Sequence, residues 1–498
     1  MEMQWKALAV GTLLAAVVLV PVSETQGGDL VYFGATVGGP TGATVWKYDT
    51  TTNTASSVEG VLSQVDSIAV DGSHVYTGIR VPGQGILKRY THAGAGQDIQ
   101  LGLSTVESLA LSDSRLYAAL SADGGGLVKH YPKTAPVIHG GIDGDIELNL
   151  GAGKELLISS DGNTLYTSLP NAGGGGIKKY NVTNPFSPAG SDFQFNQGSS
   201  NMHLDETAGR LVAGFDGNGG VTKSYPLPSG AVTDNEFGVG NAFAPAVTSG
   251  QTSNGSKVFT LFSAGNGIIK QYDMLAPAGG PPGDMANNLC GNNPGGCAAA
   301  VGDGHIQYAN GKLYALFNDG PTGAGGVLKS WDVDGPIPDG AGLNPADVSP
   351  GGQGDPLMLE LAGDLLFMGT SGSGGTLRVY DTATEQFIHE SFGYGDFTAF
   401  GSSVLAGGIL GDYNGNDVVD AADYTVWQDN LGASITLPGE NPAATTPGLV
   451  DQEDYDFWKS NFASGAGTST LAAVPEPSSI SLIGLAAVPL LTRRRRKH

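Results

Sequence analysis

The sequence is poor in charge and in cysteine. Only 14% of its 498 residues are charged, and 48 Asp and Glu residues against 24 Lys and Arg give a net charge of −24. A field of that sign repels phosphate backbones, so we expect no nucleic-acid partner. The two cysteines, Cys290 and Cys297, have no nearby His, which argues against a zinc site. In an exported chain they predict a disulfide, with two free thiols as the alternative.

Motifs of known catalytic chemistry are missing as well. There is no G-x-S-x-G and no H-E-x-x-H, and Gly-rich runs such as 124–126 precede predicted strands, as hairpin turns do. Seven histidines fall at unrelated places in the sequence, which predicts surface residues: His74, His92, His130, His139, His203, His305 and His389. Two carboxylates about 5 to 9.5 Å apart would suffice for a glycosidase, and 48 acidic residues leave that alternative open.

What the chain has in quantity is glycine, at 79 positions, within a repeat. The clearest marker is an aromatic residue that follows a Lys or Arg by one or two positions. It recurs eight times, mostly every 41 to 49 residues: Tyr48, Tyr90, Tyr131, Tyr180, Tyr225, Tyr272, Trp331 and Tyr380. Internal repeats of this length are typical of solenoids and propellers.

Each repeat predicts four short strands joined by Gly-rich turns, which together describe a β-propeller blade. We therefore predict a mainly β fold, a propeller over residues 28–410 with eight blades, seven being the alternative. The first repeat begins at Leu30 with what corresponds to a second strand, and Phe397–Phe400 resembles a first strand. A C-terminal strand that completes the N-terminal blade would close the ring.

Seven cations precede the repeated aromatic by two positions and would lie on one circle: Lys88, Lys129, Lys178, Lys223, Lys270, Lys329 and Arg378. They could attract an anionic polymer. The simpler interpretation is that each stem lies along a neighbouring blade and its charge pairs with an acid such as Asp66, Glu107 or Glu155. We favour the second interpretation.

The two ends of the chain resemble targeting segments. Residues 1–27 contain the apolar run 7–20 and predict a secretory signal peptide. Residues 474–498 carry Pro475, Glu476 and Pro477, a short apolar helix over 480–491, and the cluster Arg493, Arg494, Arg495 and Arg496. Cations there would hold the terminus on the cytoplasmic side of a membrane.

This C-terminal segment resembles the PEP-CTERM sorting signal, which is also labelled an ice-binding-protein C-terminal domain. The resemblance implies a membrane-bound exosortase as a processing partner, a membrane anchor through the C-terminal helix before processing, and delivery to the cell surface or extracellular matrix.

Between the propeller and a linker over 465–473, residues 411–464 change character. Oxygen-bearing side chains alternate with spacers, as a Ca²⁺ loop requires. The predicted ligands of one Ca²⁺ are Asp412, Asn414, Asn416, the carbonyl of Val418, Asp420 and Asp423. A helix over Tyr424–Leu431 should follow and end at Gly432.

The loop and helix resemble the first half of a type I dockerin, and a second half follows 31 residues later at Val450–Asn461. The resemblance implies a cohesin-like partner. Asp417 replaces the usual glycine of the loop, and the second copy lacks its early ligands, so we predict one Ca²⁺ at most.

These features predict an exported surface or matrix protein whose propeller is a non-catalytic binding or structural module. The alternative is an extracellular carbohydrate-active enzyme or polysaccharide-binding protein that assembles through the dockerin-like unit. Paired carboxylates at the centre of the propeller would favour the alternative, whereas a centre lined by Gly, Ala and Val would favour the first hypothesis.

Overall fold

A computed structural model describes two parts of the chain. The first is residues 30–402 apart from 37–41, 51, 63, 72, 95, 113, 122–126, 134–143, 148–153, 161, 170–175, 184–190, 195–198, 207, 216–220, 228–232, 238–245, 253–254, 263–267, 275–282, 288–304, 318–325, 334–345 and 349–353. The second is residues 411–462 apart from 412, 414–418, 420, 434–436, 438, 440–445 and 447–448. They belong to two compact units, residues 1–407 and 408–498.

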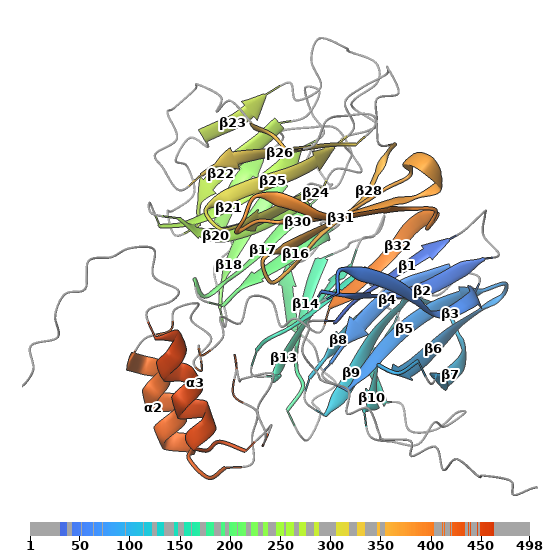
Figure 1. The fold of residues 1–498 in the computed structure, drawn as a ribbon, viewed down its shortest axis with the longest axis horizontal. Coiled ribbons are helices and arrows are strands. Elements are labelled where there is room, and N and C mark those ends of the chain that lie inside the picture. The colour runs from blue at the N-terminus through green and yellow to red at the C-terminus, as the bar shows by residue number, and fades with distance from the viewer. Residues whose placement is uncertain are drawn as a thin grey trace, which may run out of the picture. The chain divides into compact units, whose positions relative to one another are not determined.

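The first unit contains eight four-stranded antiparallel sheets (Figure 1). From innermost to outermost strand, the first four are β32 (Asp396–Ser402), β1 (Leu30–Thr36), β2 (Ala43–Asp49), β3 (Thr54–Leu62); β4 (Gln64–Val70), β5 (His74–Val81), β6 (Gln84–Thr91), β7 (Gly96–Leu103); β8 (Thr105–Leu111), β9 (Arg115–Ser121), β10 (Leu127–Pro132), β11 (Gly144–Glu147); and β12 (Glu155–Ile158), β13 (Thr164–Leu169), β14 (Gly176–Asn181), β15 (Ser191–Gln194).

The other four are β16 (Ser199–Asp205), β17 (Arg210–Phe215), β18 (Val221–Pro226), β19 (Thr233–Phe237); β20 (Ala246–Thr252), β21 (Gly255–Phe262), β22 (Ile268–Asp273), β23 (Gly283–Asn287); β24 (His305–Ala309), β25 (Lys312–Phe317), β26 (Val327–Asp332), β27 (Ala346–Asp347); and β28 (Pro356–Ala362), β29 (Leu365–Thr370), β30 (Thr376–Asp381), β31 (Gln386–Phe392). A 3₁₀ turn, Gly372–Gly374, connects β29 and β30.

The innermost strands contact one another in a closed cycle, β32–β4–β8–β12–β16–β20–β24–β28 and back to β32. Each sheet therefore packs between two others, as in a propeller. Because both faces of a sheet are covered, its second strand is buried almost throughout, and the pattern in β13, β17, β25 and β29 is one half-buried residue followed by five buried ones. All eight repeated aromatics of the third strands are buried in the packing between sheets.

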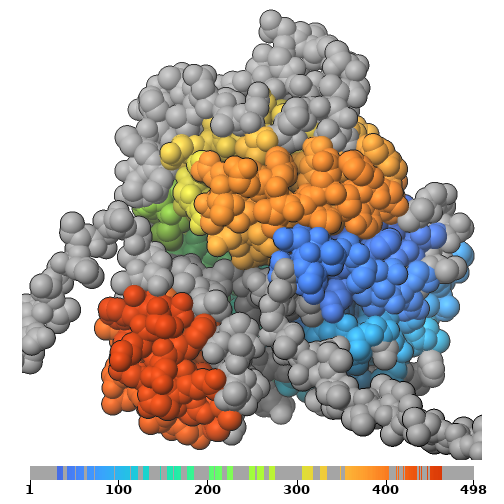
Figure 2. All heavy atoms as spheres, in the orientation of Figure 1, coloured from blue at the N-terminus to red at the C-terminus, as the bar shows by residue number. Residues whose placement is uncertain are grey.

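The ring closes by pairing its two ends. β32 is antiparallel to β1, with Phe33 opposite Phe400, so the last strand completes the first sheet as the sequence predicted. In Figure 2 the orange surface near the end of the first unit adjoins the blue surface of its N-terminal part.

Aromatic side chains fill the closing seam. The ring of Phe33 lies 5.3 Å from that of Tyr394 and 5.5 Å from that of Phe397, and Trp46 meets Tyr394 edge-on at 4.9 Å. A Cβ on Gly369 would approach the ring of Phe397 to 2.7 Å, so the seam has no room for a side chain there.

The second unit holds two helices, α2 (Ala421–Asn430) and α3 (Gln452–Asn461), in contact with each other. Tyr413, Trp427, Leu437 and Val450 form its buried core. The prediction that α2 starts at Tyr424 was wrong by one turn, because Ala421 and Ala422 have high helix propensity. Gly432 follows α2 with φ +84°, as a left-handed helix end requires.

Aromatic packing at the closing seam should carry a large share of the stability of the ring. Replacing Phe397 (5% exposed) by Ala should lower the free energy of unfolding by about 3 to 5 kcal/mol. The matched control Phe392→Ala removes a ring that is 57% exposed and should cost less than about 1 kcal/mol. Urea unfolding of both variants checks this, and equal losses would contradict it.

Candidate functional site

The seven cations that precede the repeated aromatics lie opposite acids. Each occupies the third strand of its sheet, and the residue directly across from it on the outermost strand is an Asp or a Glu. The pairs are Lys88–Asp98, Lys129–Asp145, Lys178–Asp192, Lys223–Asp234, Lys270–Asp284, Lys329–Asp347 and Arg378–Glu390. Opposite charges directly across an antiparallel pair attract, so this backbone register favours pairing of each cation with an acid of its own sheet.

The side-chain contacts of Lys88 and Arg378, the first and last of the seven cations, agree with that register. The Lys88 ammonium lies 2.8 Å from Glu59 on the preceding sheet and 3.6 Å from Asp98 on its own, and 5.6 Å from the centre of the Tyr90 ring. Arg378 Nε donates to Glu390 at 2.8 Å. The side chains of Lys88 and Arg378 are thus packed between acids and the aromatic rings of Tyr90 and Phe387.

The acids expected to pair with these cations have other partners. Asp66 binds Arg80 at 3.2 Å, Glu107 accepts a hydrogen bond from Ser121 at 2.7 Å, and Glu155 accepts one from the backbone N–H of Met202 at 2.6 Å. The prediction that these acids pair with the cations was wrong. All three acids lie on innermost strands, whereas the cations lie on third strands, nearer the outer edge of each sheet. The acids at the outer edge recur in the sequence, and their recurrence could have identified them.

Polar residues are distributed unevenly over the innermost strands. We compare the two positions that Ser67 and Ala69 occupy on one face of β4 with the equivalent positions of the other innermost strands. In β4, β8 and β32 these positions carry only small residues: Ser67, Ala69, Ser108, Ala110, Ala399 and Gly401. The strands on the other side of the cycle carry larger polar groups at these positions, namely Glu155, Asn201, His203, Thr248, His305, Gln307 and Glu360. This polar half of the ring is the strongest candidate for a functional site in the described part of the chain.

Two carboxyl groups of the polar half have a raised pKa. Glu155 on β12 and Glu360 on β28 belong to strands on opposite sides of the cycle. Burial raises the pKa of each carboxyl to about 7, and repulsion from Glu360 contributes to the raised pKa of Glu155. Each is therefore partly protonated at neutral pH and can donate as well as accept a proton.

The histidines of the polar half are not ordinary surface residues, which corrects the sequence-based prediction for two of the seven. Burial lowers the pKa of His305 to about 4, and it lowers the pKa of His203 against the attraction of Asp205. Both imidazoles are neutral at pH 7. Gln307 completes the group, since its amide lies 3.4 Å from a carboxyl oxygen of Glu360. No spacing rule in the sequence brings these strands together.

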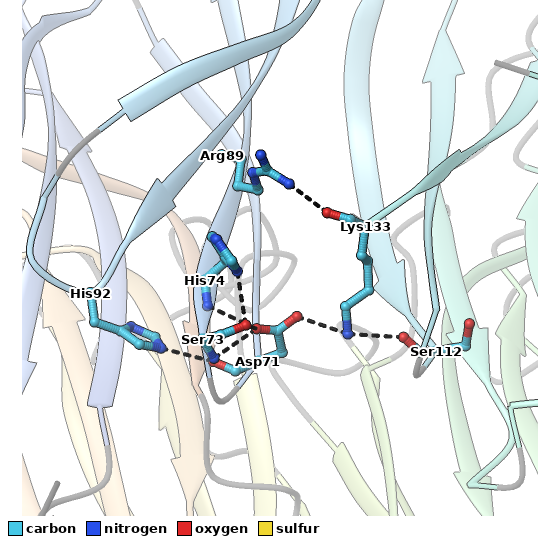
Figure 3. Close-up of polar contacts among 7 residues, drawn as sticks. All are labelled: Asp71, Ser73, His74, Arg89, His92, Ser112 and Lys133. Atoms are coloured by element: carbon cyan, nitrogen blue, oxygen red, sulfur yellow. Dashed lines mark hydrogen bonds and ion pairs between the residues drawn. The ribbon is translucent and has the colours of Figure 1, made fainter. Parts of the chain in front are cut away.

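A second polar network joins the β4–β7 and β8–β11 sheets at the turns (Figure 3). Asp71 pairs with Lys133 at 2.8 Å, and Lys133 also donates to the carbonyl of Ser112 at 3.1 Å. Arg89 donates to the carbonyl of Lys133. His92 bridges Tyr32, at 2.8 Å, and the carbonyl of Asp71, at 2.9 Å.

This network contains a Ser–His contact, Ser73 Oγ to His74 Nδ1 at 2.8 Å, without the geometry of a catalytic triad. Asp71 Oδ1 accepts from the Ser73 hydroxyl and from the backbone N–H groups of Ser73 and His74, at 2.8 to 2.9 Å. It thus stabilises the turn and does not orient the imidazole. The hydrogen bonds of Asp71 and its pairing with Lys133 hold the pKa of this carboxyl below its usual range. We assign the network to the joining of neighbouring sheets, including the sheet of β1 through Tyr32.

In the second unit, Asp423 is the one predicted Ca²⁺ ligand within the described residues, and Asp412, Asn414, Asn416, Val418 and Asp420 lie outside them. Asp423 is fully buried in the first turn of α2, and its repeat counterpart Asp454 is 2% exposed in the first turn of α3. Asp454 Oδ2 accepts the backbone N–H of Asp451 at 2.8 Å and closes a capping box.

The remaining predicted site residues cannot be placed. Cys290, Cys297, the signal segment 1–27 and the sorting residues of 474–498 lie outside the described residues. Within the described ranges, no three or more His, Cys, Asp or Glu side chains are grouped so that they could hold a metal ion. The described helices include none that is long and apolar enough to cross a membrane.

No family model and no curated protein matches this sequence. Among solved structures, the dihydro-heme d1 dehydrogenase NirN in complex with DHE is similar over 74% of this chain and 74% of its own, with a TM-score of 0.51 and 12% identity. Sqt1 of Saccharomyces cerevisiae has a TM-score of 0.48 at 12% identity over 66% of this chain and 85% of its own. The Pseudomonas aeruginosa periplasmic gluconolactonase PpgL has a TM-score of 0.43 at 13% identity, over 75% of this chain and 98% of its own. At such identities the likeness to NirN shows the fold alone, a mainly β, propeller-like one.

The outer ion pairs should matter for stability. Replacing Lys88 by Met leaves Glu59 and Asp98 facing each other without a counter-charge, and should lower the free energy of unfolding by about 1 to 3 kcal/mol. The control Lys312→Met removes a more exposed pair with Glu385 and should cost less than about 1 kcal/mol. Thermal unfolding of both variants measures the difference. Unchanged stability of Lys88→Met, with lost affinity for an anionic polysaccharide, would favour the ligand role instead.

Proposed function

We propose that this protein is exported and displayed on the cell surface or in the extracellular matrix, where its propeller is a non-catalytic binding or structural module. The proposal takes the eight sheets as eight blades of one closed ring. The observation that carries the proposal is that the recurring polar side chains hold the ring together. The seven cations lie opposite acids, and innermost polar side chains bond to the backbone of the next sheet.

The proposed localisation is based on the two ends of the chain. An apolar run follows the N-terminus, and Pro475, Glu476 and Pro477 precede an apolar stretch and Arg493–Arg496. The resemblance to a PEP-CTERM signal supports an exosortase-type sorting partner and a membrane-anchored precursor.

Deletion of residues 474–498 should redirect the protein. In a host that carries an exosortase-type enzyme, the full chain should be found processed at the surface or in the matrix. The truncated chain should be found unprocessed in the periplasm or medium. Replacing Arg493–Arg496 by Gln, which keeps the apolar stretch, is the matched control for the role of charge. Identical fractionation of all three would contradict the sorting role.

An extracellular carbohydrate-active or polysaccharide-binding protein is the second candidate, and one observation favours it. Glu155 and Glu360 are two carboxylates with a pKa of about 7, and a carboxyl that is protonated near neutral pH can act as a general acid on a glycosidic bond. Neutral histidine and glutamine side chains on neighbouring strands are the kind of hydrogen-bonding groups that face sugars.

A glycan array and a hydrolysis assay separate the two candidates. The first predicts no polysaccharide turnover, and any binding should be the same for the wild type and Glu360→Gln. The second predicts turnover that Glu360→Gln lowers by about 100-fold or more, since a general acid contributes about that factor. Met358→Leu, a substitution on the same strand, is the control that leaves the carboxyls in place.

We further propose that the second unit is a dockerin-like module that binds one Ca²⁺ through Asp412, Asn414, Asn416, Val418, Asp420 and Asp423, and that it docks a cohesin-like partner or stiffens the connection to the anchor. The fully buried carboxyl of Asp423 in the first turn of α2 supports this assignment. Oxygen ligands from one alternating loop suit Ca²⁺, which takes six to eight of them.

Calcium should stabilise the second unit. In the full chain, 1 mM Ca²⁺ should change the fluorescence of buried Trp427 and raise the melting temperature of that unit, and EDTA should reverse both. Asp412→Ala should abolish the response, whereas Asp456→Ala, on the exposed side of α3, should preserve it. A response that survives Asp412→Ala would assign the metal to another place.

A further inference from the structure

Three consecutive innermost strands, β16, β20 and β24, each carry a polar side chain that makes no hydrogen bond with any other described residue. These side chains are His203, Thr248 and His305. On the other side of the cycle the fold uses such groups itself, since Ser67 Oγ donates to the carbonyl of Val106 at 2.9 Å. A polar group that leaves water without gaining a partner destabilises the folded state, so these three side chains call for another partner.

Solvent reaches the polar side chains of β16 and β24. In β24, Ile306 is 4% exposed and packs between sheets, whereas His305 and Gln307 on either side of it are partly accessible. In β16 the same alternation recurs, with Met202 5% exposed and His203 partly accessible. Successive side chains of a strand point to opposite faces, so the polar ones turn away from that packing. On the innermost strands of a closed ring, they line its central space.

Protein atoms surround these imidazoles closely. Burial lowers the pKa of His305 to about 4, and it lowers the pKa of His203 as well, although both rings are partly accessible. A group that is accessible and yet poorly hydrated lies in a confined space. A hydrogen bond from a ligand is stronger in such a space than at an open surface, because fewer waters compete for it.

The charges of the central space disfavour an anion. No Lys or Arg lies on the described innermost strands, so an anion would find no counter-charge there. Both imidazoles are neutral at pH 7, and the carboxyl of Glu360, whose pKa burial raises to about 7, is partly protonated. Neutral imidazole, amide, hydroxyl and protonated carboxyl groups each offer a donor and an acceptor. The hydroxyl groups of a sugar also donate and accept, so a neutral sugar matches this set, whereas a uronate or a sulfated sugar does not.

The fold holds Gln307 in one orientation. Its Nε2 donates to the carbonyl of Leu359 at 3.2 Å and lies 3.4 Å from a carboxyl oxygen of Glu360. The amide oxygen of Gln307 is thereby left as an acceptor for a ligand hydroxyl, and little side-chain entropy remains to be lost on binding.

The opposite side of the ring leaves room for a ligand. In the cycle of eight innermost strands, β32, β4 and β8 lie diametrically opposite β16, β20 and β24. At the position equivalent to those of His203 and Gln307, these three strands carry Gly401, Ala69 and Ala110. A wall of small apolar residues thus faces a wall of hydrogen-bonding groups, and a sugar ring has both an apolar C–H face and a polar edge.

We propose that the central space of the ring binds a neutral sugar, either a monosaccharide or the end of a polysaccharide chain, whose hydroxyl groups contact His203, Thr248, His305, Gln307 and Glu360. This inference rests on the closed ring and on the polysaccharide-binding candidate described under Proposed function, and it names the class of sugar and the residues that hold it. Binding of this kind requires no cleavage of a glycosidic bond.

A glycan array that carries neutral, uronic-acid and sulfated glycans tests the class of ligand on the full chain. Neutral glycans should bind at least about tenfold more tightly than their uronic-acid counterparts, because the described innermost strands offer no cation. Binding of acidic glycans alone would overturn this site and leave polysaccharide binding elsewhere on the protein, whereas binding of no glycan would overturn both. Tighter binding of spermidine than of any neutral glycan, abolished by Glu360→Gln, would assign the site to an amine and overturn the proposal as well.

Variants separate binding from folding. Thr248→Val and His305→Leu remove polar groups that make no hydrogen bond with other described residues, so they should keep or raise the melting temperature of the first unit and weaken binding of the neutral glycan about tenfold. Ser67→Ala is the matched control, because it removes a hydroxyl that joins β4 to β8. It should lower the melting temperature and change the affinity less than about threefold.

Should His305→Leu not fold, Thr248→Val carries the test alone. A neutral glycan whose affinity survives the substitutions that fold would be bound elsewhere on the protein, which would overturn the assignment of the site and leave the polysaccharide-binding candidate intact.

Discussion

The structure of the first unit depends on the pairing of β32 with β1. Without it, the sheet of β1, β2 and β3 would lack its innermost strand, and the cycle of innermost strands would be interrupted between β28 and β4. A ring closed by its own two ends has no terminal sheet with an uncovered face, so each of the eight sheets packs between two others. The aromatic rings of Phe33, Trp46, Tyr394 and Phe397 supply the packing energy at this point.

Charge is arranged by distance from the centre of the ring. The cations occupy third strands, and the acids opposite them occupy fourth strands. The Lys88 and Arg378 side chains are 16% and 12% exposed, whereas Asp98 and Glu390 across from them are 39% and 42% exposed. On innermost strands, burial shifts the carboxyl groups of Glu155 and Glu360 towards their neutral forms. The first sheet departs from the outer pattern, because Trp46 opposite Ser57 stands where other sheets have a cation opposite an acid. Where the ring closes, Trp46 therefore packs against Tyr394 at the position where the other sheets have a cation opposite an acid.

Much of the architecture could be predicted from periodicity. The recurrence of Tyr90, Tyr131 and their equivalents marked the third strands, and Asp-Gly and Gly-rich turns marked the hairpins. The first repeat begins with what corresponds to a second strand, and Phe397–Phe400 resembles a first strand, which together predicted closure; the β32–β1 pairing confirmed it. Local patterns suffice here because the repeats are short and every strand except β32 pairs with a neighbour in sequence.

The candidate site could not be predicted in the same way. Glu155 and Glu360 are about two hundred residues apart and occupy different positions of their repeats, and nothing in either repeat distinguishes them from surface acids. Likewise, His203 and His305 were expected on the surface, although they lie on innermost strands. The pKa of a side chain depends on the protein that surrounds it, and that environment exists only in the folded ring.

The sequence by itself thus determined a mainly β repeat, its closing strand, and a duplicated helical motif before a terminal segment with the pattern of a sorting signal. These are properties of short stretches, in which spacing and residue type act through nearest neighbours. Tertiary structure alone decided which charges meet. The ring brings strands from opposite halves of the chain into one cycle, and burial there raises the pKa of both Glu155 and Glu360.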